Sequence, residues 1–287
     1  MTSGPHLPLV LCNVSVSDIP LRQVIPAAAA AGFEAITIVG GALRRSIERD
    51  GVGPDELARM VRDHGLVVTD VEAVGDWWAP LPTDSPKWLQ PGFDECEFLD
   101  LAATFGARNL VATHFGPMGP IDEAAREFAR LCDAAADRDL SVALEYPAMA
   151  TLGDVATAWA IVERAGRANG GIVHDVWHHD RSTATDADLD AVPADRFLSI
   201  QLSDASAERR GPPIEDARYR RLVGEGDLNV VEGLRRLVAR SVRCPIGIEV
   251  FVSFDLRPVD ERIREFADNL RWAATAAGLT TRDRRSE

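Results

Sequence analysis

Residues 140–176 read LSVALEYPAMATLGDVATAWAIVERAGRANGGIVHDV and contain two short apolar runs, at 140–146 and 170–176. Both runs are rich in Val, Ile or Leu and are bounded by Gly, Pro or polar residues, which is typical of strands buried in a parallel sheet. Between them, residues 154–165 have a helical pattern that starts at Asp154, a residue able to cap a helix. The stretch therefore predicts a strand–helix–strand unit.

The same alternation extends over the rest of the chain. Six further apolar runs have the same character, at residues 7–12, 33–39, 66–74, 107–115, 196–204 and 244–251. Helical patterns lie between the runs, at residues 18–31, 53–64, 93–105, 122–137, 229–239 and 259–277, with a weaker one at 186–189. The pattern at 122–137 starts at Asp122, which is also expected to cap its helix.

Eight alternating units predict an α/β protein with a single domain. We expect a (β/α)8 barrel, or TIM barrel, over residues 1–279, followed by a charged tail at 280–287. A doubly wound open sheet is the alternative. No G-x-G-x-x-G sequence follows the first run, so we expect no nucleotide cofactor.

Composition and charge restrict the partners of this chain. Acidic residues outnumber basic ones, 45 against 31, which gives a formal net charge of −14 at pH 7. Phosphate backbones and anionic membrane surfaces bind clustered Lys and Arg, so we expect neither a nucleic acid nor a membrane as partner. The expected partner is a small-molecule substrate, and a homodimer or homotetramer is the default assembly for a barrel with exposed loops.

Cysteine usage and the first residues of the chain indicate a cytoplasmic protein. The four cysteines are widely spaced and form no C-x-x-C pair, which favours reduced thiols. The beginning of the sequence has no basic region followed by a long apolar one, so we expect no secretory signal.

Oxygen-bearing side chains come at the ends of four consecutive predicted strands. Glu145 and Asp175 are at the ends of the fifth and sixth runs, and Gln201 and Glu249 are in the seventh and eighth. The carboxyl ends of barrel strands form the active site, so these side chains should converge. Close carboxylates repel one another unless a cation neutralises them, and oxygen ligands favour Mn²⁺, with Mg²⁺ or Co²⁺ as alternatives. The sequence therefore predicts one divalent metal at these four residues.

The stretch HDVWHHD, residues 174–180, holds three of the six histidines of the chain. Asp175 should reach the barrel axis, whereas His174 alternates to the other side of the strand and faces the helices. His178 lies on the predicted loop above the site, where it is placed to bind a substrate hydroxyl or move a proton. We therefore expect Asp175 to be the metal ligand of this stretch.

Two other strand ends and one loop provide further candidates. His114 follows the fourth run and is expected to face the mouth as a second acid or base, with a structural histidine as the alternative. Glu72 ends the third run and is a candidate to bind a substrate hydroxyl. Trp77, Trp78 and Trp88 lie on a Pro-rich loop that is expected to cover the mouth and exclude water, unless these rings pack against the barrel rim.

Five segments together resemble the xylose-isomerase-like barrel family of sugar isomerases and epimerases, which includes inosose dehydratase and one type of 3-dehydroshikimate dehydratase. The segments are ALEY with Glu145, HDVWH with Asp175 and His178, IQLSDA with Gln201 and Asp204, RLVGEGDLN with Arg221, and IGIEVF with Glu249. The resemblance covers nearly the whole chain and implies that the metal ligands are Glu145, Asp175, Gln201 and Glu249. It also implies that Glu145 and Glu249 act as acid and base, and that His178 and Arg221 lie near the substrate. Val223 stands where the family has proline in a P-G-E-G segment, which leaves the pose of Arg221 open.

The predicted reaction removes a proton beside the carbonyl of a keto-sugar, a polyol-derived ketone or a cyclic hydroxyketone, through a metal-bound enediolate. Return of the proton to the substrate gives an isomerase or epimerase, which is the first prediction. Loss of a β-hydroxyl instead gives a dehydratase, and Gln201 favours it, because by resemblance the epimerases often have His there. A non-catalytic or partner-dependent barrel subunit is the alternative of another class.

Overall fold

Eight parallel strands form a closed barrel in the computed structural model, which describes residues 4–80, 92–251 and 257–282. Each strand pairs with the next one in the chain, and the last pairs with the first to close the barrel. The strands are β1 (Leu9–Leu11), β2 (Ala35–Val39), β3 (Val67–Val74), β4 (Asn109–Ala112), β5 (Ser141–Leu144), β6 (Gly170–Asp175), β7 (Phe197–Leu202) and β8 (Ile246–Ile248). All eight lie within the predicted apolar runs, so the (β/α)8 prediction is confirmed.

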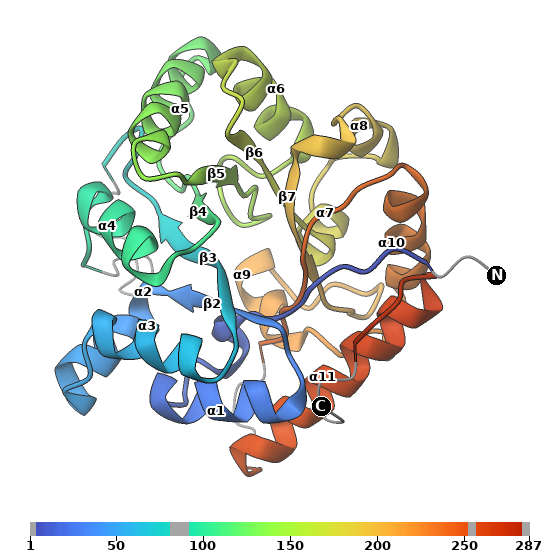
Figure 1. Ribbon diagram of the computed structural model, residues 1–287. Helices are drawn as coiled ribbons and strands as arrows, with labels where there is room; N and C mark the ends of the chain where they lie inside the picture. Colours follow the sequence, from blue (N-terminus) through green and yellow to red (C-terminus); the bar gives the residue numbers. More distant parts are fainter. Residues whose placement is uncertain (1–3, 81–91, 252–256, 283–287) are drawn as a thin grey trace.

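Helices surround the barrel and cover the outer face of its strands (Figure 1). In the described ranges the α-helices are α1 (Leu21–Ala31), α2 (Gly40–Arg45), α3 (Pro54–Asp63), α4 (Glu95–Phe105), α5 (Ile121–Ala136), α6 (Val155–Ala165), α7 (Val176–Arg181), α8 (Asp186–Asp190), α9 (Pro213–Asp216), α10 (Val230–Ala239) and α11 (Val259–Ala276). A π-helical turn, η2 (Ser46–Asp50), continues α2, and short 3₁₀ segments are η1 (Asn13–Val16), η4 (Ala194–Arg196) and η5 (Ala217–Tyr219). The sequence did not predict α2, η2, α7 or α9.

Local sequence chemistry explains where several helices begin. Asp94 and Glu97 form a capping box at the start of α4, in which each side chain accepts the backbone N–H of the other residue. Asp154 caps α6 through its side chain, as expected. The expectation that Asp122 caps the next helix upstream is wrong. That helix, α5, begins one residue earlier, and its N-cap is Pro120, which makes no side-chain hydrogen bond.

Packed side chains fill the barrel below its mouth. Asp70 on β3 accepts hydrogen bonds from Asn109 on β4, at 2.9 Å, and from Ser199 on β7, at 3.4 Å. β3 and β7 are not neighbours in the sheet, so this polar layer crosses the barrel interior. Outside the barrel, a continuous apolar core joins the strands to the helices. The packed barrel therefore gives the strand ends fixed positions on which a site can be built.

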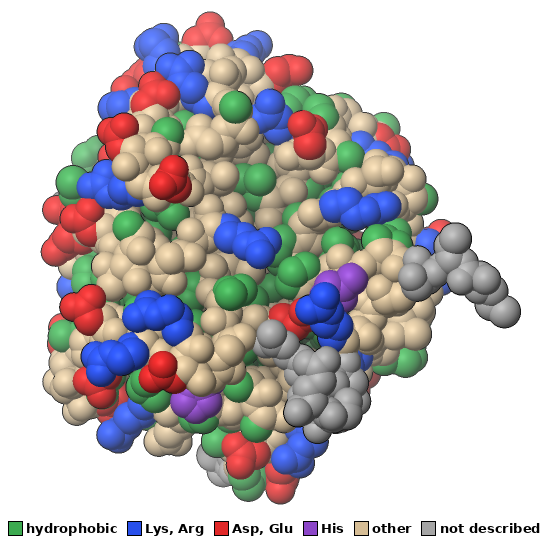
Figure 2. All heavy atoms as spheres, viewed as in Figure 1, with side chains coloured by type: hydrophobic (Ala, Val, Ile, Leu, Met, Phe, Trp, Pro, Cys, Tyr) green, Lys and Arg blue, Asp and Glu red, His purple; other side chains and the backbone are tan. Residues whose placement is uncertain are grey.

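The first and last described segments of the chain lie side by side, because His6 and Thr280 form a parallel bridge near the end of α11 (Figure 1). The first residue of the predicted tail is thus held by the fold, whereas residues 283–287 lie outside the described ranges. Acidic and basic side chains are interspersed around the periphery of one face (Figure 2). Within the described ranges, no helix is long and apolar enough to cross a membrane.

Candidate active site

The ends of β5 to β8 bring the predicted oxygen ligands to one end of the barrel. Asp175 and Gln201 are paired in register on the adjacent strands β6 and β7. Glu145 and Glu249 come directly after the last residues of β5 and β8. All four side chains are buried. Glu145 and Glu249 line a cavity of about 880 Å³, which is large enough for a small organic substrate.

Asp175 joins the end of β6 to the start of α7. Its Oδ1 accepts hydrogen bonds from the backbone N–H groups of Trp177, at 2.7 Å, and His178, at 3.0 Å. This N-cap fixes the carboxylate and the first helical turn relative to each other. His178 therefore lies on α7, not on a loop as expected from the sequence, and its side chain lines the cavity.

His178 presents a hydrogen-bond donor toward Glu145. Its Nδ1 accepts a hydrogen bond from the Ala148 N–H at 3.1 Å, so a neutral ring carries its hydrogen on Nε2. This Nε2 lies 3.6 Å from Glu145 Oε1. Burial lowers the pKa of His178 to about 3, which keeps the ring neutral at physiological pH. The ring is therefore a fixed donor near neutral pH and not a base.

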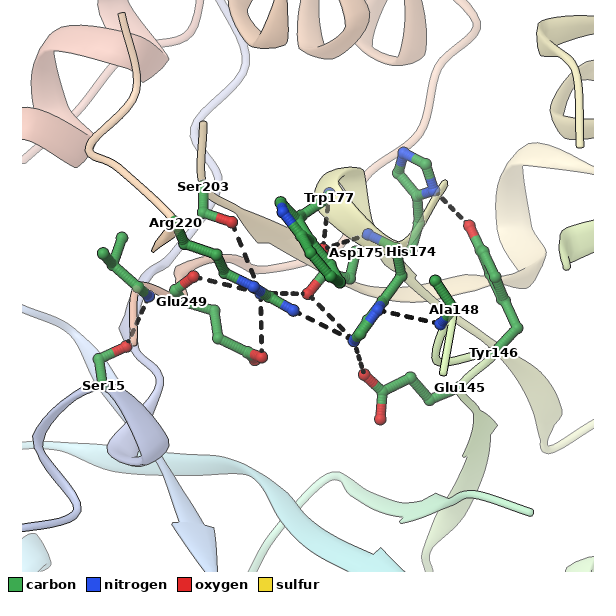
Figure 3. A network of polar contacts seen from close by, with 12 residues as sticks. Ser15, Glu145, Tyr146, Ala148, His174, Asp175, Trp177, Ser203, Arg220 and Glu249 are labelled. Carbon is green, nitrogen blue, oxygen red and sulfur yellow. Dashed lines mark hydrogen bonds and ion pairs between the residues drawn. The ribbon is translucent and has the colours of Figure 1, made fainter. Parts of the chain in front are cut away.

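Arg220 lies at the centre of the site, although the sequence did not predict it there. Its Nη1 donates hydrogen bonds to Asp175 Oδ2, at 2.7 Å, and to Glu249 Oε1, at 3.2 Å (Figure 3). Its guanidinium also stacks on the rings of Trp177 and Phe251, with 4.6 Å from Cζ to each ring centroid. The side chain is fully buried. Ion pairs and aromatic contacts thus restrain this cation in one place.

Arg221, the arginine predicted near the substrate, lies outside this arrangement. Its backbone forms an antiparallel bridge with Asp204, and its side chain donates a hydrogen bond to Glu225 O at 2.9 Å. It does not line the cavity. Successive residues of an extended segment point in opposite directions, so the bridge that directs Arg221 outward directs Arg220 inward. Two adjacent arginines in a loop have no periodicity from which this choice could be read.

The carboxyl groups of the site differ in how easily they ionise. Burial, followed by the charges of Asp175 and Glu72, raises the pKa of Glu145 to about 8. Burial also raises the pKa of Glu72 to about 7 and that of Glu249 well above its ordinary value. For Asp175 burial acts in the same direction, but the charge of Arg220 opposes it, and the pKa of Asp175 is lowered. The site therefore holds one carboxyl that ionises readily and three that keep their protons to higher pH.

A family model described as xylose isomerase-like TIM barrel matches residues 25–276. The chain belongs to this family. Among curated relatives, the 3-dehydroshikimate dehydratase of Pseudomonas aeruginosa is 26% identical over 247 residues, which cover 84% of this chain and 37% of the relative. The chain thus spans well under half the length of that relative.

Two solved structures share the fold. A xylose isomerase-like TIM barrel/4-hydroxyphenylpyruvate dioxygenase fusion protein superposes with a TM-score of 0.82 at 20% identity, over 95% of this chain and 43% of the fusion protein. The IOLI protein with a binding zinc atom superposes with a TM-score of 0.76 at 16% identity, over 95% of this chain and 98% of that protein.

The donor atoms of this chain fit the divalent metal that the family resemblance implies. Carboxylate oxygens of Glu145 and Asp175 lie within 4.8 Å of each other. Gln201 Oε1 is buried and has no hydrogen-bond partner among the described residues. Glu249 Oε1 and Asp175 Oδ2 contact the same guanidinium nitrogen, so these two carboxyls are also close together. A partnerless buried amide oxygen beside several carboxyls suits a cation that prefers oxygen ligands.

The remaining sequence candidates divide between the cavity and the space behind it. Glu72 lines the cavity, and its Oε1 has no hydrogen-bond partner in the described part of the chain. His114, expected to face the mouth, is instead fully buried beside Trp78, with 4.5 Å between ring centroids, and does not line the cavity. Thr113 and Phe115 line the cavity instead, because alternate residues after β4 face opposite sides.

The tryptophans expected to cover the mouth pack behind it. Trp77 is buried, donates from Nε1 to Thr113 O at 2.7 Å, and makes an edge contact with Phe128 on α5. Trp78 is partly buried and stacks on His114. Neither lines the cavity, so the packing alternative describes their positions. Trp88 lies outside the described residues.

Proposed function

We propose that this protein is a divalent-metal-dependent dehydratase that acts on a cyclic hydroxyketone. The observation that carries the proposal is the pairing of Glu145 with His178, whose Oε1 and Nε2 are 3.6 Å apart at the cavity. A β-elimination needs an acceptor for the C–H proton and a donor for the departing hydroxyl. Glu145 and His178 provide these two functions side by side. The amide of Gln201 and the dehydratase among the curated relatives support the same outcome.

Each cavity residue has a separate task in this mechanism. A divalent ion held by Glu145, Asp175, Gln201 and Glu249 would supply the positive charge that acidifies the C–H beside the ketone and favours ionised Glu145 near neutral pH. Glu145 takes the proton, and the C–H electron pair forms the new double bond. The hydroxyl leaves with its bonding pair, stabilised by the His178 donor. The proton on Glu145 then completes a water molecule.

Arg220 lies next to the His178 donor. Its Nη2 lies 3.2 Å from His178 Nε2, although both atoms are hydrogen-bond donors. Two donors that face each other need an acceptor nearby, and a substrate oxygen would serve both. The same guanidinium neutralises Asp175 and Glu249, which keeps these carboxyls in place.

An isomerase or epimerase that uses the same cavity is the second candidate. Glu145 and Glu249 both line the cavity, and they come from the ends of β5 and β8, which are not neighbours in the barrel. Two carboxyls on different sides of a substrate would allow removal of a proton from one face and its return to the other. This arrangement supports epimerisation as a separate outcome of the same proton abstraction.

The test is turnover by the protein loaded with Mn²⁺, with 3-dehydroshikimate, an inosose and D-fructose as substrates. Dehydration gives a conjugated product with new ultraviolet absorbance. Isomerisation or epimerisation gives no such absorbance, but it incorporates deuterium from D2O into the substrate, which NMR detects. Glu145→Gln should abolish the reaction, and the exposed Glu225→Gln should leave it unchanged. Deuterium incorporation without a conjugated product would replace the dehydratase by the second candidate. Neither signal with Mn²⁺, Mg²⁺ or Co²⁺ would overturn both and favour a partner-dependent subunit.

A further inference from the structure

One part of the cavity wall is strongly basic. It is lined by Arg44, Arg45 and Arg49, with Glu48 as the acidic residue among them, and a further arginine, Arg218, lines the cavity from η5. The chain as a whole has a net charge of −14, so the composition does not explain this grouping. The acidic residues Glu72, Glu145 and Glu249 lie instead at the floor of the cavity, on the strand ends. The cavity therefore has an acidic floor and a basic wall.

The chain after β2 brings Arg44, Arg45 and Arg49 together. α2 starts directly after Val39, and the π-helical turn η2 extends it at the mouth. Arg45 and Arg49 are four residues apart and so lie on the same side of this helical segment, where like charges repel. The pKa of Arg45 is lowered, by burial first and by the charge of Arg49 second. Such π-turns are frequent at functional sites.

The protein neutralises these charges only in part. Arg45 Nη2 donates a hydrogen bond to Ser17 O at 2.6 Å, and Arg44 Nε lies 3.7 Å from Glu48 Oε1. Arg49 and Arg218 make no hydrogen bond or ion pair with any residue of the described ranges. An anion inside the cavity would therefore meet guanidinium groups that the fold leaves available.

We propose that Arg44, Arg45 and Arg49 bind an anionic group of the substrate, either a carboxylate or a phosphate. The ketone and hydroxyl oxygens of that substrate lie at the acidic floor. The inference rests on the proposed function in that the cavity is the substrate site. Guanidinium groups match both anions through paired N–H donors. A neutral keto-sugar leaves these donors unpaired, so the preferred substrate class is an anionic hydroxyketone.

The shape of the cavity agrees with a ring that carries such a group. A volume of about 880 Å³ admits a substituted six-membered ring. Phe115, Met149 and Phe251 also line the cavity and provide apolar surface for the faces of the ring. Polar groups at the floor and at the basic wall would then hold the ring by two different edges.

Paired probes that the protein cannot turn over test this inference. Shikimate and methyl shikimate are cyclic triols without a ketone and differ by one carboxylate charge. Sorbitol 6-phosphate and sorbitol differ by one phosphate. Calorimetry with the full-length chain, with and without Mn²⁺ and at low ionic strength, gives the Kd of each. We expect the anionic member of at least one pair to bind about 10-fold or more tightly than its neutral partner.

Variants at the basic wall connect this preference to named residues. Arg49→Gln should lower the preference by about 5-fold, and Arg45→Gln/Arg49→Gln should nearly abolish it, whereas Arg49→Lys should keep most of it. Arg59→Gln removes the same charge from the exposed side of α3 and should change nothing. Affinity for the neutral probes should stay constant, which shows that the floor is intact.

Preference for shikimate identifies a carboxylate site, and preference for sorbitol 6-phosphate identifies a phosphate site. Equal affinities within both pairs would overturn the inference, and so would a preference that survives the double variant or a failure of all four probes to bind. These outcomes are separate from turnover. A preference that depends on Arg49, found together with absent turnover, would remove the proposed reaction and leave the anion site standing.

Discussion

Arg220 and Asp175 form a fully buried ion pair, with 2.7 Å between Nη1 and Oδ2. The other oxygen of Asp175, Oδ1, caps α7. One carboxylate therefore connects a strand end, a helix start and the segment that carries the central cation. Because both groups are buried, removal of either would leave an uncompensated charge in a site with little access to water.

Arg220→Gln should destabilise the metal-free protein by about 3–5 kcal/mol, because it leaves the buried, ionised Asp175 without its counter-charge. It should also lower kcat/KM by about 100-fold or more, since the His178 donor loses its neighbour. Arg221→Gln is the matched control, because the one side-chain hydrogen bond that Arg221 makes within the described residues is to Glu225 O. It should change stability by less than about 0.5 kcal/mol. Urea denaturation and steady-state kinetics measure both effects, and equal losses in the two variants would contradict the central position of Arg220.

Purified tag-free protein should contain about one divalent ion per chain by inductively coupled plasma mass spectrometry. The Glu145→Ala/Glu249→Ala variant should lose it, because two of the four expected ligands are removed. Gln201→His should retain it, since imidazole is also a good ligand for Mn²⁺ or Co²⁺. Glu225→Ala, at an exposed position, controls for nonspecific loss. Metal content that is the same in the double variant and the wild type would place the ion elsewhere.

Metal-free protein should become less stable as the pH rises from about 7 to about 8.5. The pKa values of Glu72 and Glu145 in the folded state are about 7 and about 8, both raised, with burial as the main cause. In this window the folded state binds more protons than the unfolded state, so the free energy of unfolding falls as the pH rises. The contribution of the two glutamates is complete below the ordinary glutamate pKa, and it is lost as the pH passes through their raised pKa values. Urea denaturation in the presence of a chelator gives the free energy of unfolding at each pH, and therefore its slope against pH.

Two comparisons connect that slope to the site. Glu145→Gln should remove much of it, because the amide does not ionise. Added Mn²⁺ should stabilise the protein more at the higher pH, since the ion binds ionised carboxylates and releases their protons. If the stability of the metal-free wild type does not depend on pH, burial does not raise the pKa values of these carboxyls.

His178→Asn should lower kcat by about 10²–10⁴-fold, because it removes the donor that faces Glu145. His114→Asn should leave kcat within a few-fold of wild type, because His114 does not line the cavity. The substitution should instead lower the thermal stability of the protein, because the contact between His114 and Trp78 is lost. Kinetics and thermal unfolding of the two variants separate these roles. A large loss of kcat in His114→Asn without a loss of stability would restore the catalytic role expected from the sequence.

Short-range sequence patterns were enough to locate the strands and the residues at their ends. Buried parallel strands appear as short apolar runs, and alternation with helices requires all strands to run in one direction. All carboxyl ends therefore meet at one end of the barrel. For this reason Glu145, Asp175, Gln201 and Glu249 could be grouped before their distances were known, and the structure places them at that end.

Tertiary packing decided the direction of side chains wherever periodicity stops. The bridge between Arg221 and Asp204 selects Arg220 as the buried cation, although the two arginines are adjacent in the sequence. His114 comes after the last residue of β4 and turns toward Trp78, not toward the mouth. The arginines after β2 reach the cavity through a helix and a π-turn that the sequence did not predict. Beyond a strand end no repeat fixes the orientation of a side chain, so contacts between distant segments determine it.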